Sequence, residues 1–457
     1  MKLKYWILIL FALSTVIRLF FNFSQELIPG VNGGYYPLQV RSILANEHLG
    51  FSDMPLLFYL DAFLIKFISF FGFSITDTLI LTLVKIVDSI SLPLLLLPLY
   101  KIIRFRNPLQ ILDISILAFS VLSFSPFILT SDLQKNALAI VFMFGFLAYY
   151  LSFQINKKRI DFLLLIIFLL LTAMTHFGTF VFGSFFLFLS VFHNYKKKAI
   201  IPMTILVVVG LRIVFLIDNS RFNRLVSFYT VIFEKPALLN GILSPPDFLI
   251  ILFSIILAII GIIILKSKSS SLKPIQKAFL FACIVCLLVC SFPLLDGEYF
   301  KRLSLFLFIP QLLLIIQISS VLEIKQQKTI GIFLFIFTFL SVFAVALHPK
   351  ETVISKNAYE DLKKLHTIIT NDNQTIIIAR HGLEWWTAWA LNTKVGQDKA
   401  IDKSFFEKYK NVIFINQING FNTDRQRTPF HEPYVPENSK MIFSSGYFNA
   451  YKLNNKR

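Results

Sequence analysis

Polar side chains gather in the first 60 residues, directly after an opening apolar segment. The run VNGGYY carries Asn32, Tyr35 and Tyr36, and Arg41 and Asp53 follow within a turn-rich passage that ends in FSDMP. A carboxylate can accept a proton from a reacting group. An arginine can bind a phosphate through two parallel hydrogen bonds. These residues are therefore candidates for acid–base chemistry and for phosphate binding.

A second polar turn, SDLQKN, carries Asp132 and Lys135 where another apolar helix is expected to begin. Two interpretations are open. Asp132 caps the helix by accepting from its first backbone N–H groups, or it serves as an acid–base group or metal ligand while Lys135 binds a phosphate. Asp53 has the same alternative of capping the helix that follows it.

Two later turns also carry candidates. The run DGEYFKR contains Asp296, Lys301 and Arg302 before a late apolar segment. It is either a solvated loop whose charges neutralise one another, or a phosphate clamp centred on Arg302. His176 lies in the short turn THFG, where a histidine is either a hydrogen-bonded turn residue or a ligand-facing group.

The elements that must position these residues are membrane helices. The chain has 457 residues, of which 56% are hydrophobic and 15% charged, and its mean hydropathy is +0.70. Soluble domains carry about 25% charged residues. Twelve apolar segments follow one another, at 4–22, 55–71, 76–100, 109–129, 137–153, 160–175, 177–193, 199–217, 246–265, 276–294, 303–321 and 329–347. The composition predicts a polytopic α-helical membrane protein.

Basic loops predict the orientation. Lysines and arginines near residues 101–106, 157–159, 196–198, 266–273 and 325–328 are each two segments apart, so the positive-inside rule places them in the cytoplasm. The same rule explains the net charge of +18 without a nucleic acid partner. The N-terminal lysines also belong inside, so an even number of spans must separate them from residue 101.

One early segment must then fail to cross. The segment 55–71 contains Asp61 and Lys66, and as a helix it is about 26 Å long, shorter than the ~30 Å hydrocarbon core. We expect it to lie in the outer interface. Eleven spans remain, with a cytoplasmic N-terminus and an extracytoplasmic C-terminus, and all the candidate residues above fall on the outer side.

The chain changes character near residue 350. Helical spacing in SKNAYEDLKKLHTII is followed by the β-rich runs TIIIAR, NVIFINQ and KMIFSS. We therefore expect two domains: a transmembrane domain at 1–349, with interfacial helices in its outer loop 23–75, and a small soluble α/β domain at 350–457.

The motifs VNGGYY, QVRS, PLLFYL, SDLQKN and DGEYFKR, in this order among apolar helices, resemble the GT-C superfamily of membrane glycosyltransferases. That superfamily includes protein mannosyltransferases, aminoarabinose transferases and oligosaccharyltransferase catalytic subunits. The resemblance implies a GT-C-like bundle, a polyprenyl-phosphate-linked sugar as donor, a glycan or protein acceptor outside the cytoplasm, and inversion at the transferred sugar. It also implies that Tyr35, Tyr36, Arg41, Lys135, His176, Lys301 and Arg302 contact the substrates or their phosphate.

Residue 32 departs from the family pattern, which has an acidic residue just before the Gly/Tyr turn. Asn32 cannot accept a proton near neutral pH, although it can hydrogen-bond an acceptor. The catalytic carboxylate should then be Asp132 or, failing that, Asp53. Asp132 is also the candidate ligand for a divalent metal, Mg²⁺ or Mn²⁺. The alternatives are a non-catalytic relative, or a polymerase or translocase of envelope glycans.

Overall fold

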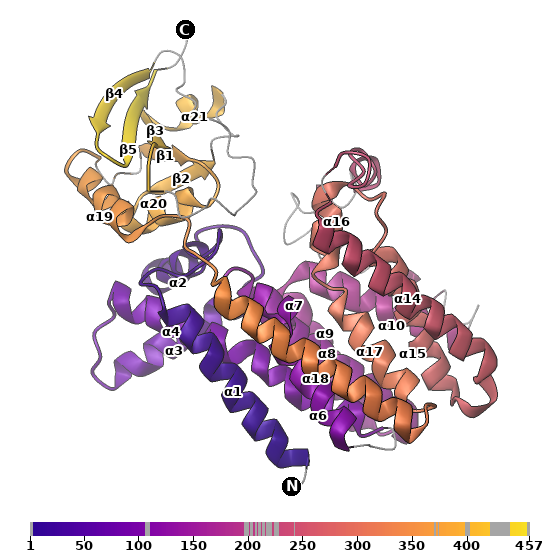
Figure 1. The fold of residues 1–457 in the computed structure, drawn as a ribbon. Coiled ribbons are helices and arrows are strands. Elements are labelled where there is room, and N and C mark those ends of the chain that lie inside the picture. The colour runs from indigo at the N-terminus through magenta and orange to yellow at the C-terminus, as the bar shows by residue number, and fades with distance from the viewer. Residues whose placement is uncertain are drawn as a thin grey trace. The chain divides into compact units, whose positions relative to one another are not determined.

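The chain is mostly helical and ends in a small sheet (Figure 1). The computed structural model describes residues 3–105, 110–195, 228–241, 243–369, 372, 374–397, 403–420 and 439–454, with isolated positions between 201 and 223. The chain divides into two compact units. The first comprises Met1–Phe11, Leu94–Phe127 and Ala139–Ala344, and the second comprises Ala12–Pro93, Ile128–Leu138 and Val345–Arg457. The predicted domain boundary after residue 349 stays a prediction.

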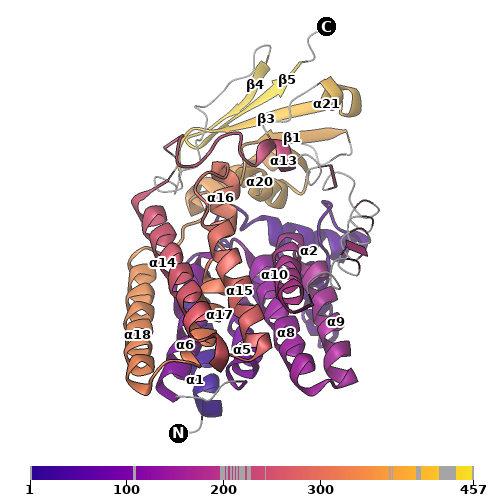
Figure 2. The ribbon, with the colours of Figure 1, turned by 90° about the vertical axis from the view of Figure 1, so that its right-hand side faces the viewer.

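The first unit is a bundle of apolar helices. Most of them run side by side in both views (Figure 1 and Figure 2). Its described helices, including those that continue into the second unit, are α1 (Leu3–Phe23), α5 (Leu96–Ile103), α6 (Gln110–Leu122), α7 (Phe124–Ile128), α8 (Gln134–Asn156), α9 (Arg159–Thr175), α10 (Phe177–Tyr195), α13 (Phe228–Val231), α14 (Pro245–Ser267), α15 (Pro274–Cys290), α16 (Gly297–Ser304), α17 (Phe308–Ser319) and α18 (Ile324–Leu347), with 3₁₀ turns at Leu92–Leu95 and Ser269–Ser271.

Seven stretches of the described chain are long and apolar enough to cross a membrane, or eight if the bent pair α16 and α17 counts as one span. They are Leu3–Phe23, Asp77–Ile103, Ile111–Ile128, Gln134–Asn156, Phe177–Asn194, Asp247–Ser267 and Ile324–Leu347. The prediction of a multi-pass α-helical membrane protein is confirmed, whereas the number eleven is not. The predicted segment 199–217 falls largely outside the described residues, and α9 and α15 have 17 residues each.

Three helices of the second unit follow the first span. Helix α2 (Tyr35–Asn46) ends at Glu47, which has a left-handed φ of 66° and donates its N–H to the Ile43 carbonyl. Helix α3 (Leu56–Phe70) starts after a proline and has 15 residues, or about 22 Å. It is shorter than the helices counted as candidate spans, and its predicted place in the outer interface stays a prediction. Thr76 caps α4 (Asp77–Ser91) by accepting from an N–H of its first turn at 3.2 Å.

The C-terminal part of the second unit is a five-stranded mixed sheet. Its order is β2-β1-β3-β5-β4, with β1 parallel to β2 and β3, and β5 antiparallel to β3 and β4. The strands are β1 (Thr375–Ala379), β2 (Lys394–Gln397), β3 (Asn411–Gln417), β4 (Ser439–Ser444) and β5 (Phe448–Leu453), and the helices are α19 (Lys356–Lys363), α20 (Leu383–Leu391) and α21 (Lys403–Lys408), with a 3₁₀ turn at Lys364–Thr367. The predicted α/β character is confirmed.

Side chains alternate between the two faces along each strand, and the central strands β1 and β3 are buried on both faces. Ile376, Ile378 and Phe414 form a core with Phe405 of α21 on one face. Helix α20 lies on the other face of the sheet (Figure 2). Trp385 and Trp386 of α20 pack against Gly34 in the VNGGYY run.

Candidate active site at the VNGGYY turn

The turn that precedes α2 is built around an aspartate 100 residues away in sequence. Gly30 has a φ of +94°, and a Cβ placed on it would lie 2.6 Å from the Cβ of Asp132. A Cβ on Gly33 would lie 2.1 Å from the Ile28 carbonyl oxygen. Only glycine tolerates the first conformation and the second close approach. The glycines of this stretch therefore let the backbone close over Asp132.

Asp132 holds that turn through its side chain. Its Oδ1 accepts the backbone N–H of Asn32 at 2.6 Å, and Nζ of Lys350 lies 3.6 Å from its Oδ2. Its main-chain oxygen accepts from the Tyr36 hydroxyl at 3.1 Å. The Asp132 side chain keeps 18% of its surface exposed. The Asp132 carboxylate is thus hydrogen-bonded to the VNGGYY turn and remains partly exposed.

The backbone at residue 131 sets the direction of the next side chain. Ser131 has a left-handed φ of 66°, which is costly for a serine. Its N–H donates to Oδ2 of Asp88 at 2.8 Å, and the same oxygen accepts from the Asn22 side chain at 2.8 Å. Asp88 is buried within the span Asp77–Ile103. A buried carboxylate therefore supports the strained residue beside Asp132.

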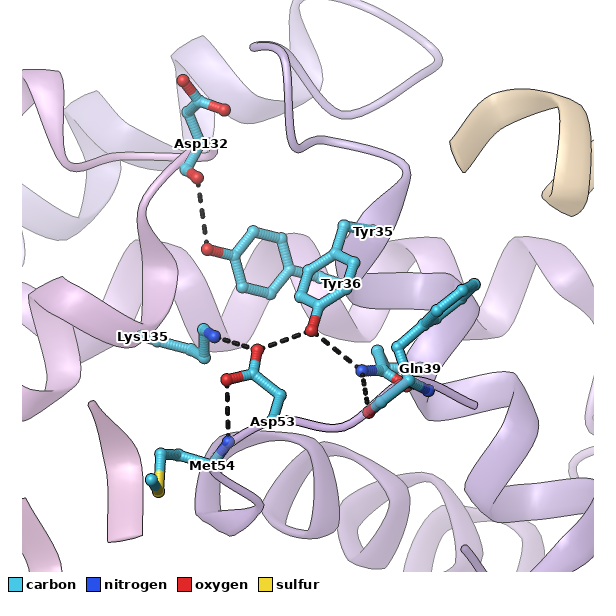
Figure 3. A network of polar contacts seen from close by, with 8 residues as sticks. Tyr35, Tyr36, Gln39, Asp53, Met54, Asp132 and Lys135 are labelled. Atoms are coloured by element: carbon cyan, nitrogen blue, oxygen red, sulfur yellow. Dashed lines mark hydrogen bonds and ion pairs between the residues drawn. The ribbon is translucent and has the colours of Figure 1, made fainter. Parts of the chain in front are cut away.

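Asp53 is enclosed by donors. Its Oδ2 accepts from the Tyr35 hydroxyl at 2.5 Å and forms an ion pair with Lys135, and its Oδ1 accepts the Met54 N–H at 2.7 Å. The side chains of Asp53 and Lys135 are 5% and 13% exposed. Gln39 extends the network by donating to the Tyr35 hydroxyl at 2.9 Å (Figure 3). This carboxylate is neutralised and hydrogen-bonded, which makes it a weaker candidate for a general base than Asp132.

Tyr36 separates the two carboxylates. Figure 3 shows the carboxylate of Asp132 directed away from Asp53, with Tyr36 between the two residues. Burial raises the pKa of Tyr36 well above its usual value, and the negative charge of Asp132 adds to the rise. Tyr36 is therefore a neutral hydrogen-bond donor. The Asp132 carboxylate and the Asp53–Lys135 pair face different sides of it.

An aromatic cluster lies beside the Asp53–Lys135 pair. The ring of Tyr35 makes edge contacts with Phe58 at 5.7 Å and with Trp385 of α20 at 4.9 Å between centroids. The ammonium of Lys135 lies 5.5 Å from the ring centres of Tyr35 and of Phe58. Such contacts hold a cation in place without neutralising it.

Arg41 connects α2 to the C-terminal part of the second unit. Its guanidinium donates to the carbonyls of Ala388 and Trp389 at 2.9 Å each and lies 4.2 Å from the centre of the Trp389 ring. Asp77 is 3.7 Å away. An arginine at a helix C-terminus satisfies carbonyls that lack partners within the helix. These groups already engage the donors of Arg41. Its predicted contact with a phosphate stays a prediction.

The remaining candidates belong to the first unit. His176 accepts the Thr179 N–H on Nδ1 at 3.1 Å, at the start of α10. Arg302 pairs with Glu298 one turn earlier on α16, with both side chains more than two-thirds exposed, and Lys301 is exposed beside it. His176 is thus a hydrogen-bonded turn residue, and Arg302 and Glu298 neutralise each other's charge. Each corresponds to one of the two interpretations of its sequence motif. Their predicted contacts with substrate stay predictions.

Among the described residues of the second unit, no cluster of side chains suits a divalent metal ion. No group of three or more His, Cys, Asp or Glu side chains in the described part of the chain is arranged to hold one. Mg²⁺ and Mn²⁺ prefer several oxygen ligands. Here Asp132 and Asp53 point apart, and each faces an ammonium group. The predicted metal ligation by Asp132 finds no support in this donor set.

The contacts of two supporting residues were not specified by the sequence. Lys350, which also donates to the Ile128 and Thr130 carbonyls at 3.0 and 3.3 Å, looks in the sequence like an ordinary charge after a membrane span. Lys85 and Asp88, three residues apart in an apolar segment, are expected to pair with each other or with neighbours. Lys85 donates to the Gln25 and Glu26 carbonyls, and Asp88 accepts from Asn22 and Ser131. A buried charge inside an apolar span was the only available signal.

Solved structures resemble this chain over nearly its whole length. The apo oligosaccharyltransferase of Archaeoglobus fulgidus superposes with a TM-score of 0.61 at 10% identity, covering 91% of this chain and 70% of that one. ArnT from Cupriavidus metallidurans bound to undecaprenyl phosphate superposes with a TM-score of 0.54 at 8% identity, covering 98% of both chains. The predicted GT-C fold is confirmed.

A second structure of the archaeal enzyme, in complex with Zn and sulfate, superposes with a TM-score of 0.57 at 10% identity and covers 89% of this chain and 67% of that one. No protein-family model matches the chain, and no curated protein matches its sequence. At these identities the likeness concerns the fold. The chain is a multi-pass membrane protein that shares the fold of these structures.

Proposed function

We propose that this protein transfers a sugar from a polyprenyl-phosphate donor to an acceptor on the extracytoplasmic side of the membrane. The observation that carries the proposal is Asp132, a partly exposed carboxylate held by the VNGGYY turn in a GT-C fold. The proposed orientation, from the basic loops, places this turn and the C-terminal part outside the cytoplasm.

In the proposed reaction Asp132 is the general base. It takes the proton of the acceptor nucleophile while the nucleophile forms a bond to the anomeric carbon of the sugar. The bond from that carbon to the phosphate oxygen breaks, and the polyprenyl phosphate leaves with the electron pair. Attack from the side opposite the phosphate inverts the anomeric configuration. A general base of this kind contributes about 10²–10⁴ in rate.

Asn32 is the proposed contact that orients the acceptor. Its backbone N–H is bonded to Asp132, and its side-chain amide makes no hydrogen bond to another described residue. An amide offers one acceptor oxygen and two donor hydrogens to a hydroxyl or amide group. The side chain that replaces the usual acidic residue thus binds the acceptor, and the proton goes to Asp132.

Lys135 is the proposed contact for the donor phosphate. It lies with Asp53 on the side of Tyr36 away from the Asp132 carboxylate. Inversion requires the base and the leaving group on opposite sides of the sugar, and this separation supports that assignment. The ammonium lies among aromatic rings and is paired with Asp53, so a donor phosphate would share it with that carboxylate.

The experiment is transfer of a labelled sugar from a polyprenyl-phosphate donor in membranes with matched protein levels. Asp132→Asn should lower transfer by about 10²–10⁴, Asn32→Ala should lower it less, and Asn32→Asp should retain or raise it. Glu360→Gln, which removes an exposed carboxylate of α19, is the matched control and should transfer at the wild-type rate. Full activity of both Asp132→Asn and Asp53→Asn would refute the assigned roles. No transfer by the wild type from any such donor would favour a non-catalytic relative.

A further inference from the structure

The two carboxylates of the candidate active site are each engaged by a lysine of the same chain. Asp132 faces Lys350, which follows the last span, and Asp53 faces Lys135, which opens α8. Both carboxylates also accept backbone N–H groups, from Asn32 and Met54. The site thus contains its own counterions, which a site prepared for a metal ion would not need.

The geometry of the two carboxylates also disfavours a shared divalent cation. Two carboxylates share a cation when their oxygens converge on one point, and Mg²⁺ demands close to octahedral oxygen ligands at about 2.1 Å. The carboxylate of Asp132 is directed away from Asp53, with Tyr36 between them. Among the described residues, a cation at either position would have one carboxylate ligand and a lysine ammonium as its neighbour. The bound cation and the neighbouring lysine ammonium would repel each other strongly in a partly buried site.

Lys350 is held beside the Asp132 carboxylate by two backbone carbonyls. Its ammonium lies 3.6 Å from Oδ2 of Asp132 and donates to the Ile128 and Thr130 carbonyls. Those two carbonyls belong to the backbone that leads into Asp132, so the lysine holds the carboxylate and its support together. One third of its side-chain surface is exposed, which leaves the pair within reach of a substrate.

We propose that Lys350, and not a divalent cation, is the positive partner of Asp132, and that the site works without a metal ion. Lys350 acts as a positioning residue: it orients the carboxylate toward the acceptor and balances its charge. The part of this proposal that concerns catalysis rests on the proposed function. The part that concerns metal binding does not.

The first test measures Mn²⁺ binding to the purified full-length protein by electron paramagnetic resonance, after chelator treatment. The expected result is no saturable binding up to ~1 mM, the weak end of protein sites for divalent ions. One bound Mn²⁺ per protein in that range, lost in Asp132→Asn, would overturn the proposal. This readout stands whether or not the protein transfers sugar.

The second test uses the sugar-transfer assay. Transfer should be insensitive to EDTA, and Lys350→Met should lower kcat by about 10–100-fold, as residues that orient a reactive group do, with the donor KM unchanged. Lys350→Arg should restore part of the loss. Lys363→Met, which breaks an exposed pair on α19, is the control and should leave kcat unchanged. Loss of transfer in EDTA that Mg²⁺ or Mn²⁺ reverses, or an unchanged kcat in Lys350→Met, would overturn the proposal.

Discussion

Removal of Lys135 should show how strongly the buried ion pair couples the VNGGYY loop to the second polar turn. The Asp53 and Lys135 side chains are 5% and 13% exposed, so the charge of Asp53 would remain buried in Lys135→Met. Loss of one partner of a buried pair costs about 3–5 kcal/mol. The Tyr35 hydroxyl and the Met54 N–H still stabilise the carboxylate, which favours the lower end of that range.

The double variant Lys135→Met/Asp53→Asn measures the coupling itself. Its asparagine is neutral and can still accept from Tyr35, so the double variant should be more stable than the sum of the single losses predicts, by about 2 kcal/mol. The assay is denaturant unfolding in mixed micelles, followed by tryptophan fluorescence. The exposed pair Lys363 and Glu360, 41% and 50% exposed, is the control and should couple by less than about 1 kcal/mol. Additivity of the Asp53 and Lys135 losses within about 0.5 kcal/mol would refute the reasoning.

Three further predictions concern supporting residues. Gly30→Ala should lower the melting temperature more than Gly72→Ala, since both glycines have φ above +90° but only Gly30 has a neighbour, Asp132, within 3 Å of the added carbon; equal losses would contradict this. Arg41→Lys should speed chymotrypsin cleavage in the C-terminal part, because lysine lacks the fork that binds two carbonyls; unchanged cleavage would contradict this. Burial raises the pKa of Asp61, whose carboxyl oxygens have no hydrogen-bond partner among the described residues. The folded state therefore holds a proton that the unfolded state has lost, and stability should fall as pH rises above the usual carboxyl range. Asp61→Asn should flatten this pH dependence of the melting temperature, and a slope equal to that of the wild type would contradict the prediction.

The polar turns were predictable because their residues contrast with the apolar helices around them. A carboxylate or lysine at the end of an apolar segment stands out, as Asp132 and Lys135 do. Their partners were not predictable, since Asp53 meets Lys135 across 82 residues and Asn32 meets Asp132 across 100. No local pattern encodes such contacts, which depend on how the helices pack.

Strands and spans show the same limit. The runs TIIIAR and NVIFINQ are rich in β-branched residues and became β1 and β3. Strand β2 has four residues, KVGQ, with a glycine inside it, and it exists because it pairs with β1. The helix Leu56–Phe70 was predictable from the apolar run 55–71, whereas the bend of 44° between α16 and α17 was not.

The central claim is tested most directly by an experimental structure of this protein with a polyprenyl-phosphate sugar bound. The account predicts that the phosphate contacts the Lys135 ammonium and that the face of the sugar opposite the phosphate is turned toward Asp132, within hydrogen-bond reach of an acceptor or through one water. A donor bound with its sugar away from Asp132, or with its phosphate in contact with the Asp132–Lys350 pair, would contradict the claim.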